Sequence, residues 1–519
     1  MEDQAMRPAP SADNPAAWID AVLATDPQRR FLTTPEGRQL SYAELAAATA
    51  RIGVALAQLG VVAGDRVAVQ VDKSVEALLL GIACLRSGAV LVPFNTAYMP
   101  AELDYFIGDS QPRLVVCRPQ DRASIQTLAR PHGVERVETL GAQGDGSLTE
   151  AIAAADPARF LPFAGKGDAL AALLYTSGTT GRSKGAMITR RNLAASAVSL
   201  VEAWKLSAGD VLLHALPIFH VHGLFISSNA ILAAGAGMLF LPRFDAAEVL
   251  ARLREVTVMM GVPTFYTRLL QLPGFDRAAC SNIRLFVSGS APLLAETHRE
   301  FEARTGHGIV ERYGMTETQV NSSNPYDAAC VPGSVGFPLP GVEIRITDAA
   351  SGAVLFERGA TGMIEVRGAN VFGGYWRNPE KTAADLRPDG FFITGDVGRF
   401  DDQGYLFIVG RAKDLVITGG YNVYPIEVET EIDALPGVLE SAVIGVPHPD
   451  FGEGVTAVVL TQLGATLTEA QVIEALRPRL ASYKLPKRVL FAAELPRNAL
   501  GKVQKNLLRR AHAELYQAG

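Results

Sequence analysis

A glycine-rich segment that carries several hydroxyl side chains and one lysine follows an apolar run, and its composition suits phosphate binding. It reads Tyr175-Thr176-Ser177-Gly178-Thr179-Thr180-Gly181-Arg182-Ser183-Lys184-Gly185. Glycines let the backbone turn tightly and expose successive N–H groups, while the hydroxyls and Lys184 add donors and positive charge. The spacing differs from G-x-x-x-x-G-K-[ST], so a Walker-type nucleotide site is excluded. We predict a phosphate loop of another kind, with a plain flexible Gly/Ser/Thr loop as the alternative.

The elements that must position this loop alternate between helix and strand through the first 400 residues. Ser41 and Glu44 have the spacing of a capping box, so a helix is expected from there to about Leu59. A β-branched run at 67–71 predicts a strand, 75–87 predicts a helix, and 91–93 is expected to begin a loop. Such alternation is typical of parallel sheets covered by helices.

The pattern changes in the last third of the chain. Between Val331 and Val371, Gly and Pro punctuate short alternating runs, which predicts a smaller β unit. Residues 401–414 are expected to form a linker, and a compact α+β module follows, with helices at 425–433 and 469–479 and strands at 440–446 and 488–491. The predicted fold class is therefore α/β, with a large N-terminal domain (1–410) of helix-covered β-sheets plus a small β unit, and a small α+β C-terminal domain (411–519).

Bulk properties exclude several classes of protein. The net charge is −6 and the pI about 5.9, which argues against a nucleic-acid partner, and the basic run from Lys505 to Arg510 is interpreted as a solvated helix face. None of the four cysteines lies in a CxxC pair, so neither a zinc site nor a disulfide framework is indicated, and a reduced cytoplasmic setting fits. The apolar stretch 224–241 contains Ser, Asn and Gly, and we interpret it as a buried helix, a Gly turn and a buried strand rather than a membrane span.

Five further segments, in order along the chain, resemble motifs of the adenylate-forming superfamily. This superfamily holds acyl-CoA synthetases, luciferase and peptide-synthetase adenylation domains, and the phosphate loop resembles its signature. The segments are His214 to His220, Tyr313 to Glu317, Thr394 to Asp396, Gly410 to Asp414 and Pro496 to Lys502. The resemblance covers nearly the whole chain, from about Ser41 to Lys505. It implies an ATP-driven activation of a carboxylic acid as its acyl-adenylate, followed by transfer of the acyl group to coenzyme A.

The resemblance assigns roles in the first half-reaction. Glu317, with Thr176, would hold Mg²⁺, a hard cation that prefers oxygen ligands. Asp396 would accept hydrogen bonds from the ribose hydroxyls beside Arg411, and Lys502 would stabilise charge on the phosphoryl oxygens during attack on the α-phosphorus. Thr316 and His220 are further catalytic candidates. The remaining nucleotide candidates surround the adenine, with Tyr313 stacked on it: Gly289, Ser290, Ala291, Glu311, Arg312, Tyr313 and Gly314.

The same resemblance gives the C-terminal domain a second role. Lys413 matches the family's hinge position, about which the mobile domain rotates after adenylation. Gly419, Gly420 and Tyr421 would then help to form the tunnel for the pantetheine arm of coenzyme A. ATP and coenzyme A are thus the expected co-substrates, Mg²⁺ the expected cofactor and a small carboxylate the remaining partner.

Within the superfamily, the segments resemble malonyl-CoA synthetases most. A second carboxylate would be costly to bury without a cation, and Arg268 is the candidate, with Arg284 a weaker one. His222, Ser288 and Ser290 could add hydrogen bonds, and Met315 is a further candidate for the acid pocket. Val221 and Val320 depart from the malonyl pattern, which puts strict malonate selectivity in doubt and leaves methylmalonate or another short dicarboxylate open.

Three alternatives stay open beside this interpretation. A short- or medium-chain or aryl monocarboxylate synthetase would want an apolar tunnel and no buried cation. A luciferase-like oxidative enzyme would keep the same motifs, but no feature of the sequence supports an oxygen-dependent step. An inactive or carrier-loading module is disfavoured because Lys502 and Glu317 are both present and the chain ends at Gly519, which leaves no room for a carrier domain.

Overall fold

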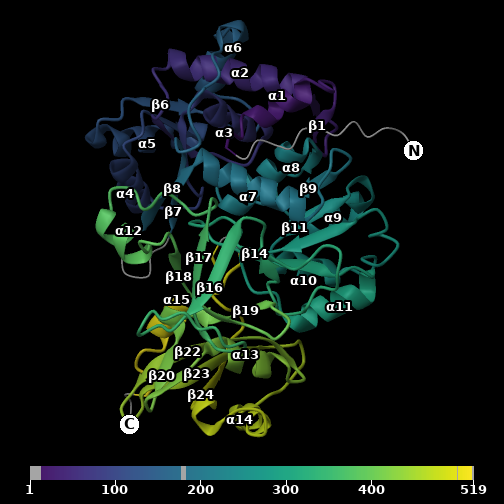
Figure 1. The fold of residues 1–519 in the computed structure, drawn as a ribbon, viewed down its shortest axis with the longest axis vertical. Coiled ribbons are helices and arrows are strands. Elements are labelled where there is room, and N and C mark those ends of the chain that lie inside the picture. Colours follow the sequence, from purple (N-terminus) through teal and green to yellow (C-terminus); the bar gives the residue numbers. More distant parts are fainter. Residues whose placement is uncertain (1–12, 177–182, 499–500, 517–519) are drawn as a thin grey trace.

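The structure is a computed structural model that describes residues 13–176, 183–498 and 501–516, and within these ranges the strands form four sheets (Figure 1). The large N-terminal body holds two sheets, a third small sheet lies beneath them, and the C-terminal module forms the lower end of the molecule in Figure 1. The predicted α/β class is therefore confirmed, with a large N-terminal part and a small C-terminal part.

Two sheets make up the N-terminal body, and their central strands are parallel. The larger has the order β15-β14-β13-β12-β11-β9-β10-β1-β2, and the smaller has the order β6-β5-β3-β4-β7-β8. The strands of the larger sheet are β1 (Arg30–Thr33), β2 (Gln39–Ser41), β9 (Val211–His214), β10 (Gly237–Phe240), β11 (Val258–Gly261), β12 (Leu285–Ser288), β13 (Ile309–Tyr313), β14 (Ser322–Ser323) and β15 (Phe337–Pro338). Those of the smaller are β3 (Arg66–Gln70), β4 (Val90–Pro93), β5 (Leu114–Cys117), β6 (Arg136–Thr139), β7 (Leu170–Thr176) and β8 (Lys184–Thr189).

Helices cover these sheets, as the alternating pattern predicts. They are α1 (Ala17–Leu23), α2 (Tyr42–Gln58), α3 (Val75–Ser87), α4 (Pro100–Ser110), α5 (Arg122–Ala129), α6 (Ser147–Ala154), α7 (Arg190–Ala203), α8 (Ser228–Ala234), α9 (Ala246–Arg252), α10 (Pro263–Leu270) and α11 (Ala295–Thr305). The capping box is confirmed: Glu44 N donates to Ser41 Oγ at 3.2 Å and Ser41 N to Glu44 Oε2 at 2.7 Å. Residues Leu78 to Arg86 of α3 are all buried, so this helix lies inside the core rather than on its rim.

One predicted loop is a strand. Residues 91–93, expected to begin a loop, belong to β4, which lies between β3 and β7. Each residue of β4 is buried, and a strand buried on both faces shows an unbroken apolar run instead of alternation. Pro93 ends the strand, where it costs little because it supplies no N–H to a ladder that stops there.

The apolar stretch 224–241 folds as the sequence predicts. It begins within a π-helix (His222–Ser227), continues as α8, turns at Gly235 in the left-handed conformation and ends with β10. Within the described ranges, none of the helices is both long and apolar enough to cross a membrane. A π-helix widens the helical turn and is frequent at functional sites. This one begins at His222, one of the residues that the sequence predicts for the acid pocket.

The small β unit is larger than predicted. It is a sheet of order β16-β17-β18-β19, made of β16 (Val342–Thr347), β17 (Gly362–Gly368), β18 (Phe392–Phe400) and β19 (Leu406–Arg411), with α12 (Pro379–Asp385) beside it. The linker predicted over 401–414 is thus partly wrong, because residues Leu406 to Arg411 pair with β18. The connection to the C-terminal module consists of a short 3₁₀ turn, Ala412–Asp414.

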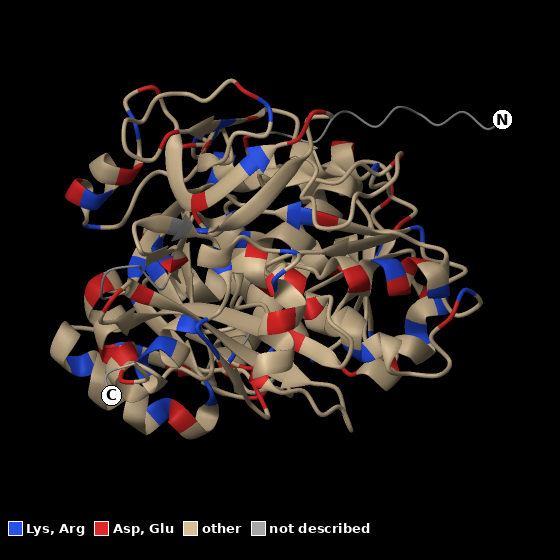
Figure 2. Ribbon diagram, turned by 90° about the horizontal axis from the view of Figure 1, so that it is seen from below, with Lys and Arg blue, Asp and Glu red and all other residues tan. Residues whose placement is uncertain are grey.

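The C-terminal module follows the predicted elements closely. It contains β20 (Val416–Thr418), β21 (Tyr421–Val423), α13 (Pro425–Asp433), β22 (Val438–His448), β23 (Gly452–Thr461), α14 (Glu469–Leu476), β24 (Arg488–Phe491) and α15 (Lys505–Ala511). The interpretation of the basic run as a solvated helix face is wrong for two residues, because Lys505 pairs with Glu429 at 2.6 Å and Arg509 with Asp414 at 2.5 Å. Figure 2 shows basic and acidic residues interspersed on the helices near the C-terminus.

Candidate nucleotide and acid site

The ribose candidate Asp396 lies on a bulge of β18. Met363 of β17 pairs with Val397 and Glu365 with Ile393, so three residues of β18 stand opposite Ile364 alone. Thr394 bridges this bulge: its Oγ1 donates to Ile364 O at 2.8 Å and accepts from Asp396 N at 3.1 Å. The bulge leaves Asp396 without a paired residue on β17, while on its other side it pairs with Arg411 of β19.

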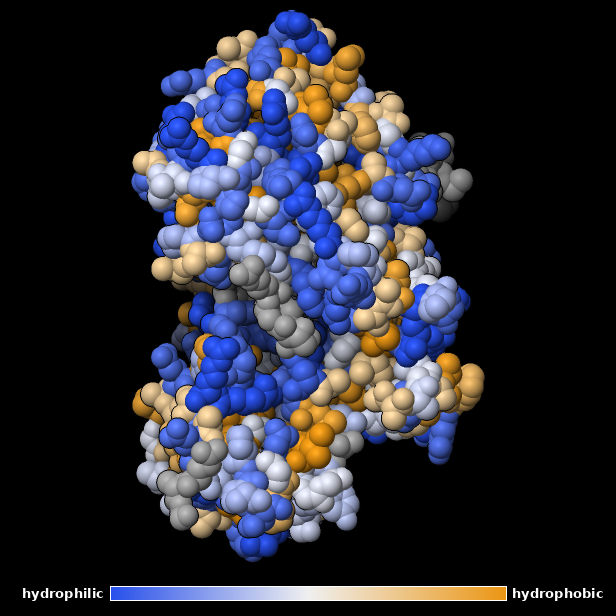
Figure 3. Space-filling view, turned by 90° about the vertical axis from the view of Figure 1, so that its left-hand side faces the viewer, coloured by the Kyte–Doolittle hydropathy of each residue, from blue (hydrophilic) through white to orange (hydrophobic). Residues whose placement is uncertain are grey.

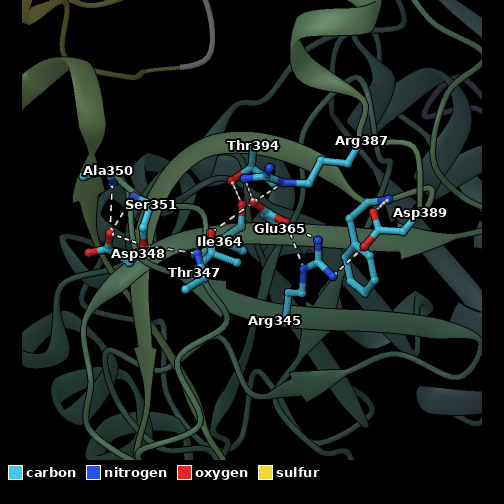
Figure 4. Close-up of polar contacts among 12 residues, drawn as sticks. Arg345, Thr347, Asp348, Ala350, Ser351, Ile364, Glu365, Arg387, Asp389 and Thr394 are labelled. Carbon is cyan, nitrogen blue, oxygen red and sulfur yellow. Dashed lines mark hydrogen bonds and ion pairs between the residues drawn. The ribbon is translucent and has the colours of Figure 1, made fainter.

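The sheet that carries this bulge is held by a buried acid with two arginines (Figure 4). Glu365 is fully buried and pairs with Arg345 at 2.8 Å and with Arg387 at 2.6 Å. Thr347 Oγ1 donates to Glu365 Oε1 at 3.0 Å, and Asp389 accepts from Arg345 at 2.7 Å. A buried carboxylate with this many donors locks the register of the strands that it joins.

Asp396 is itself shared by two partners. Tyr313 Oη donates to its Oδ2 at 2.5 Å, and Arg411 Nε lies 2.6 Å from its Oδ1. Burial and the neighbouring Asp396 charge raise the pKa of the Tyr313 hydroxyl well above its usual range, so Tyr313 stays a donor. Tyr313, Asp396 and Arg411, which the sequence places 83 and 15 residues apart, therefore form one wall of the site.

The predicted metal ligands lie together. Glu317 is buried, and its Oε1 accepts from Thr176 Oγ1 at 3.3 Å and from Tyr375 Oη at 3.2 Å. Burial raises the pKa of Glu317, and the hydrogen bonds from Tyr375 and Thr176 oppose that shift. No described cation neutralises the Glu317 carboxylate by direct contact. A hydroxyl and a buried, uncompensated carboxylate suit a hard divalent cation, so the donor set fits Mg²⁺. Sequence reasoning missed Tyr375, which shares no motif with Glu317.

The phosphate loop is only partly described. Residues Ser177, Gly178, Thr179, Thr180 and Gly181 lie outside the described residues, whereas Thr176 and Lys184 face each other at the ends of β7 and β8. Lys184 Nζ lies 5.4 Å from the centre of the Tyr375 ring. Burial, followed by the nearby charge of Lys381, lowers its pKa. The loop thus leaves and returns beside Glu317, where a nucleotide phosphate would meet it.

Lys502 enters the same region from the C-terminal module. Its hairpin touches the N-terminal body, because a Cβ on Gly501 would lie 3.0 Å from Thr264 Cγ2 of α10. Lys502 is exposed, yet the surrounding protein lowers its pKa to about 8, with the charge of Arg411 as the next cause. Figure 3 shows the surface hollowed between the two parts of the molecule, with hydrophilic residues around the hollow.

The acid-pocket candidates gather around Arg312. The guanidinium lies over Gly289, where an added Cβ would be 2.3 Å from its Nε. Burial lowers the pKa of His220 to about 4 and holds that of His222 well below its usual range, and the charge of Arg312 is the next cause for both. His222 Nδ1 lies 3.1 Å from Ser290 Oγ, and His222 N donates to His220 Nδ1 at 3.2 Å. The two histidines are therefore neutral, and Arg312 is the positive centre of the group.

Arg312 lacks partners that its burial would ordinarily require. Only 4% of the residue is exposed, and neither Nε nor Nη2 has a hydrogen-bond partner among the described residues. Three nearby polar atoms in the same ranges are also buried without a partner: Ser288 Oγ, His222 Nε2 and Glu311 Oε2. Burial raises the pKa of Glu311 to about 8, so its carboxyl is protonated at neutral pH and does not neutralise Arg312.

The structure separates the two arginines that the sequence singled out. Arg268 is exposed on α10, one turn beyond Thr264, and forms no ion pair or hydrogen bond with the residues described. Arg284 is a structural residue, since its Nε and Nη2 each donate to Asp210 at 2.7 Å, so its candidacy for the pocket is wrong. Of the remaining candidates, Val221 and Val320 are buried, and Met315, Thr316, Gly314 and Ala291 are partly accessible.

The residues predicted for the coenzyme A step lie elsewhere. Gly419, Gly420 and Tyr421 form the exposed turn between β20 and β21, and Tyr421 stacks on Tyr483 with ring centres 4.7 Å apart. Lys413 lies in the connecting 3₁₀ turn, where burial lowers its pKa. Among the described residues, no hydrogen bond, ion pair or ring contact joins the predicted pantetheine residues to Asp396, Arg411 or Glu317.

The fold consists of a large α/β body and a small C-terminal module, whose Lys502 interacts electrostatically with Arg411 and Asp396. The AMP-binding enzyme family matches residues 19–376, and the AMP-binding enzyme C-terminal domain matches residues 427–502. The chain therefore belongs to the AMP-binding enzyme family.

Individual relatives agree with this assignment. The chain is 38% identical to the mitochondrial malonate–CoA ligase of Mus musculus over 489 residues, which cover 88% of this chain and 82% of the relative. It is 55% identical to ATP-bound MatB from Rhodopseudomonas palustris, with a TM-score of 0.94 over 96% of this chain and 99% of that one. Apo MatB from the same organism is 56% identical over 97% of this chain and 99% of that one, but gives a TM-score of 0.84. At nearly equal identity, the arrangement described here is thus more similar to the ATP-bound form.

Proposed function

We propose that this protein is an AMP-forming malonate–CoA ligase, which converts ATP, malonate and coenzyme A to malonyl-CoA, AMP and pyrophosphate through malonyl-adenylate. Membership of the AMP-binding enzyme family and the malonate–CoA ligase relatives support the reaction class. The observation that carries the choice of acid is the buried guanidinium of Arg312, two of whose nitrogens lack a partner among the residues that the structure describes. An unpaired buried cation is costly, and the second carboxylate of a short dicarboxylate would complete it.

The residues would divide the first half-reaction among them. Thr176 and Glu317 would hold Mg²⁺, which when bound neutralises charge on the phosphate oxygens. Asp396 would orient the ribose from the wall that it forms with Tyr313 and Arg411. The Lys502 ammonium would stabilise the charge that develops as the malonate carboxylate attacks the α-phosphorus and pyrophosphate leaves. Coenzyme A then accepts the acyl group, with Gly419, Gly420 and Tyr421 brought to the site by rotation at Lys413.

The test is pyrophosphate release with ATP, magnesium and coenzyme A across malonate, methylmalonate, succinate, acetate, butyrate and benzoate. We expect malonate or methylmalonate to be preferred. Preference for a monocarboxylate would refute the choice of acid but leave the ligase chemistry standing.

Two matched variants locate the cation. Arg312→Met should lower kcat/KM for malonate by ~100-fold or more, as expected for loss of a buried charge partner, and should leave acetate much less affected. Arg268→Met makes the same chemical change on the exposed face of α10. If Arg268→Met produces the malonate-specific loss and Arg312→Met does not, the second carboxylate lies at α10 instead. Because Val221 and Val320 are both buried and small, methylmalonate is expected among the good substrates.

A further inference from the structure

The hairpin that carries Lys502 is closed by its own backbone. Residues Arg497 and Val503 pair as an antiparallel bridge, Asn498 N donates to Lys502 O at 2.9 Å, and Gly501 N donates to Asn498 O at 2.9 Å. Gly501 has a φ of +77°, in the left-handed region that the turn requires. These bonds involve neither the C=O of Gly501 nor the N–H of Lys502, which are the two ends of the Gly501–Lys502 peptide unit.

Two side chains hold that peptide unit at its two ends. Arg497 Nη1 donates to the carbonyl oxygen of Gly501 at 2.7 Å, and the N–H of Lys502 donates to Asn498 Oδ1 at 3.0 Å. Since a peptide unit is planar, fixing its C=O and its N–H fixes the plane and hence the direction in which the Lys502 side chain leaves the backbone.

The guanidinium is in turn anchored to the sheet of the C-terminal module. Its Nη2 makes a short ion pair with Glu440 Oε2 on β22, so one planar fork joins the Lys502 turn to a strand. A lysine could reach either acceptor but does not offer two donors in a fixed fork. Arg497 and Glu440 are both partly exposed, and neither contacts the nucleotide wall formed by Tyr313, Asp396 and Arg411 in any described interaction.

We propose that Arg497, anchored by Glu440, is a positioning residue for adenylation that sets the direction of Lys502 by holding the Gly501–Lys502 peptide plane. The proposal rests on the proposed function, because it takes Lys502 as the group that stabilises the transition state. A misplacement of about 1 Å in a catalytic group can cost ~100-fold in rate, which makes this single carbonyl contact consequential.

The experiment measures the two half-reactions separately in the full-length protein. ATP–pyrophosphate exchange with malonate reports adenylation, and thioester formation from synthetic malonyl-adenylate and coenzyme A reports the second step. Arg497→Ala should lower the first by ~10- to 100-fold and leave the second within about twofold, while Arg497→Lys should be intermediate. Arg497→Ala combined with Asn498→Ala should cost less than the product of the single effects, because both residues hold one peptide unit. Arg488→Ala removes a comparable ion pair, 3.0 Å from Glu469 in the same module, and is the matched control that should alter neither step.

A readout independent of turnover follows the lysine itself. Competitive acetylation by acetic anhydride, read by mass spectrometry, gives the pH dependence of the Lys502 amine, which should titrate near 8 in the parent protein. In Arg497→Ala this midpoint should move toward the ordinary lysine value. Equal loss of both half-reactions with a lowered Tm, or an unchanged midpoint with unchanged adenylation, would overturn the proposal. Lys502→Ala separates the two ideas. If Lys502→Ala leaves adenylation intact, the proposed role of Lys502 fails. If Lys502→Ala abolishes adenylation while the Arg497 variants stay fully active, only the positioning role of Arg497 fails.

Discussion

Replacing Gly501 by alanine should impair adenylation through two effects that can be measured separately. Gly501 has a φ of +77°, and an alanine there costs about 1 kcal/mol relative to glycine. Its Cβ would also lie 3.0 Å from Thr264 Cγ2, which forces either the turn or α10 to shift at a cost of about 1 kcal/mol. The sum of about 2 kcal/mol corresponds to an adenylation rate about 30-fold lower.

The second effect exists only while the hairpin contacts the N-terminal body. Thr264→Ala leaves Thr264 Cβ as the nearest side-chain atom, 3.8 Å from the added methyl, which is ordinary van der Waals contact. The double variant Gly501→Ala/Thr264→Ala should therefore recover adenylation about fivefold over Gly501→Ala, as expected for about 1 kcal/mol. Thr264→Ala alone serves as the control, and adenylation is followed by ATP–pyrophosphate exchange with malonate. If Thr264→Ala restores nothing, the hairpin does not approach α10 during adenylation and the reasoning is refuted.

Three further predictions follow from the electrostatics and packing of the site. Adenylation should decline as the pH rises through about 8, because Lys502 then loses the proton that its role requires. In Lys502→Arg any residual activity should lack this decline. If the decline persists in that variant, another group causes it. Gly289→Ala should raise the KM for malonate by ~10-fold or more with little change in the KM for ATP, since its Cβ would lie 2.3 Å from Arg312 Nε; an equal rise in both constants would contradict the placement of Arg312. The pKa of Glu311 is raised by burial from 4.5 to about 8, so the folded state prefers the protonated acid and loses stability as the pH rises from 4.5 to 8, by up to ~1.4 kcal/mol per pH unit. Glu311→Gln removes this loss, so the Tm of the variant minus that of the parent protein should increase from pH 5 to pH 8 and stay constant above pH 8. A Tm difference that does not depend on pH would show that Glu311 does not titrate in this range.

Local sequence patterns predicted most elements correctly because their signals are local. The ends of α3, α13 and β24 match their predicted ranges, since a hydrophobic period or a terminating proline decides each of them. The errors lie where long-range pairing decides. Residues 406–411 read as a linker beside Asp401 and Asp402, and only pairing with β18 makes them a strand. Residues 91–93 read as a loop because of Pro93, and only neighbours on both sides make them a central strand.

Motif order predicted which residues meet, but not which lack a partner. Glu317 with Thr176, and Asp396 with Arg411, lie as the family resemblance implies. Arginine, however, has the same sequence signature whether it is paired with Asp210, as Arg284 is, or buried with two nitrogens that lack a partner in the described part of the chain, as Arg312 is. Tyr375 escaped notice for a related reason, because its hydrogen bond to Glu317 depends on the fold rather than on spacing. Arg497 lies inside the Pro496–Lys502 motif, but its bond to the Gly501 carbonyl likewise cannot be read from the sequence.

The polar groups left incomplete around the acid pocket connect stability with recognition. Arg312, Ser288 and His222 each keep buried atoms without a hydrogen-bond partner in the described ranges, and each such atom costs the folded protein free energy. Families of sequences that only had to fold would replace such groups with apolar ones, because an apolar core of the same shape is more stable. Groups of this kind are retained where a ligand completes them, and a ligand that does so also stabilises the fold in proportion to its occupancy. A dicarboxylate supplies acceptors for these donors, whereas a monocarboxylate, whose single carboxylate is committed to the α-phosphorus, leaves the guanidinium unsatisfied. On the proposed function, the pocket would therefore select its acid through the cost of leaving the Arg312 guanidinium unsatisfied.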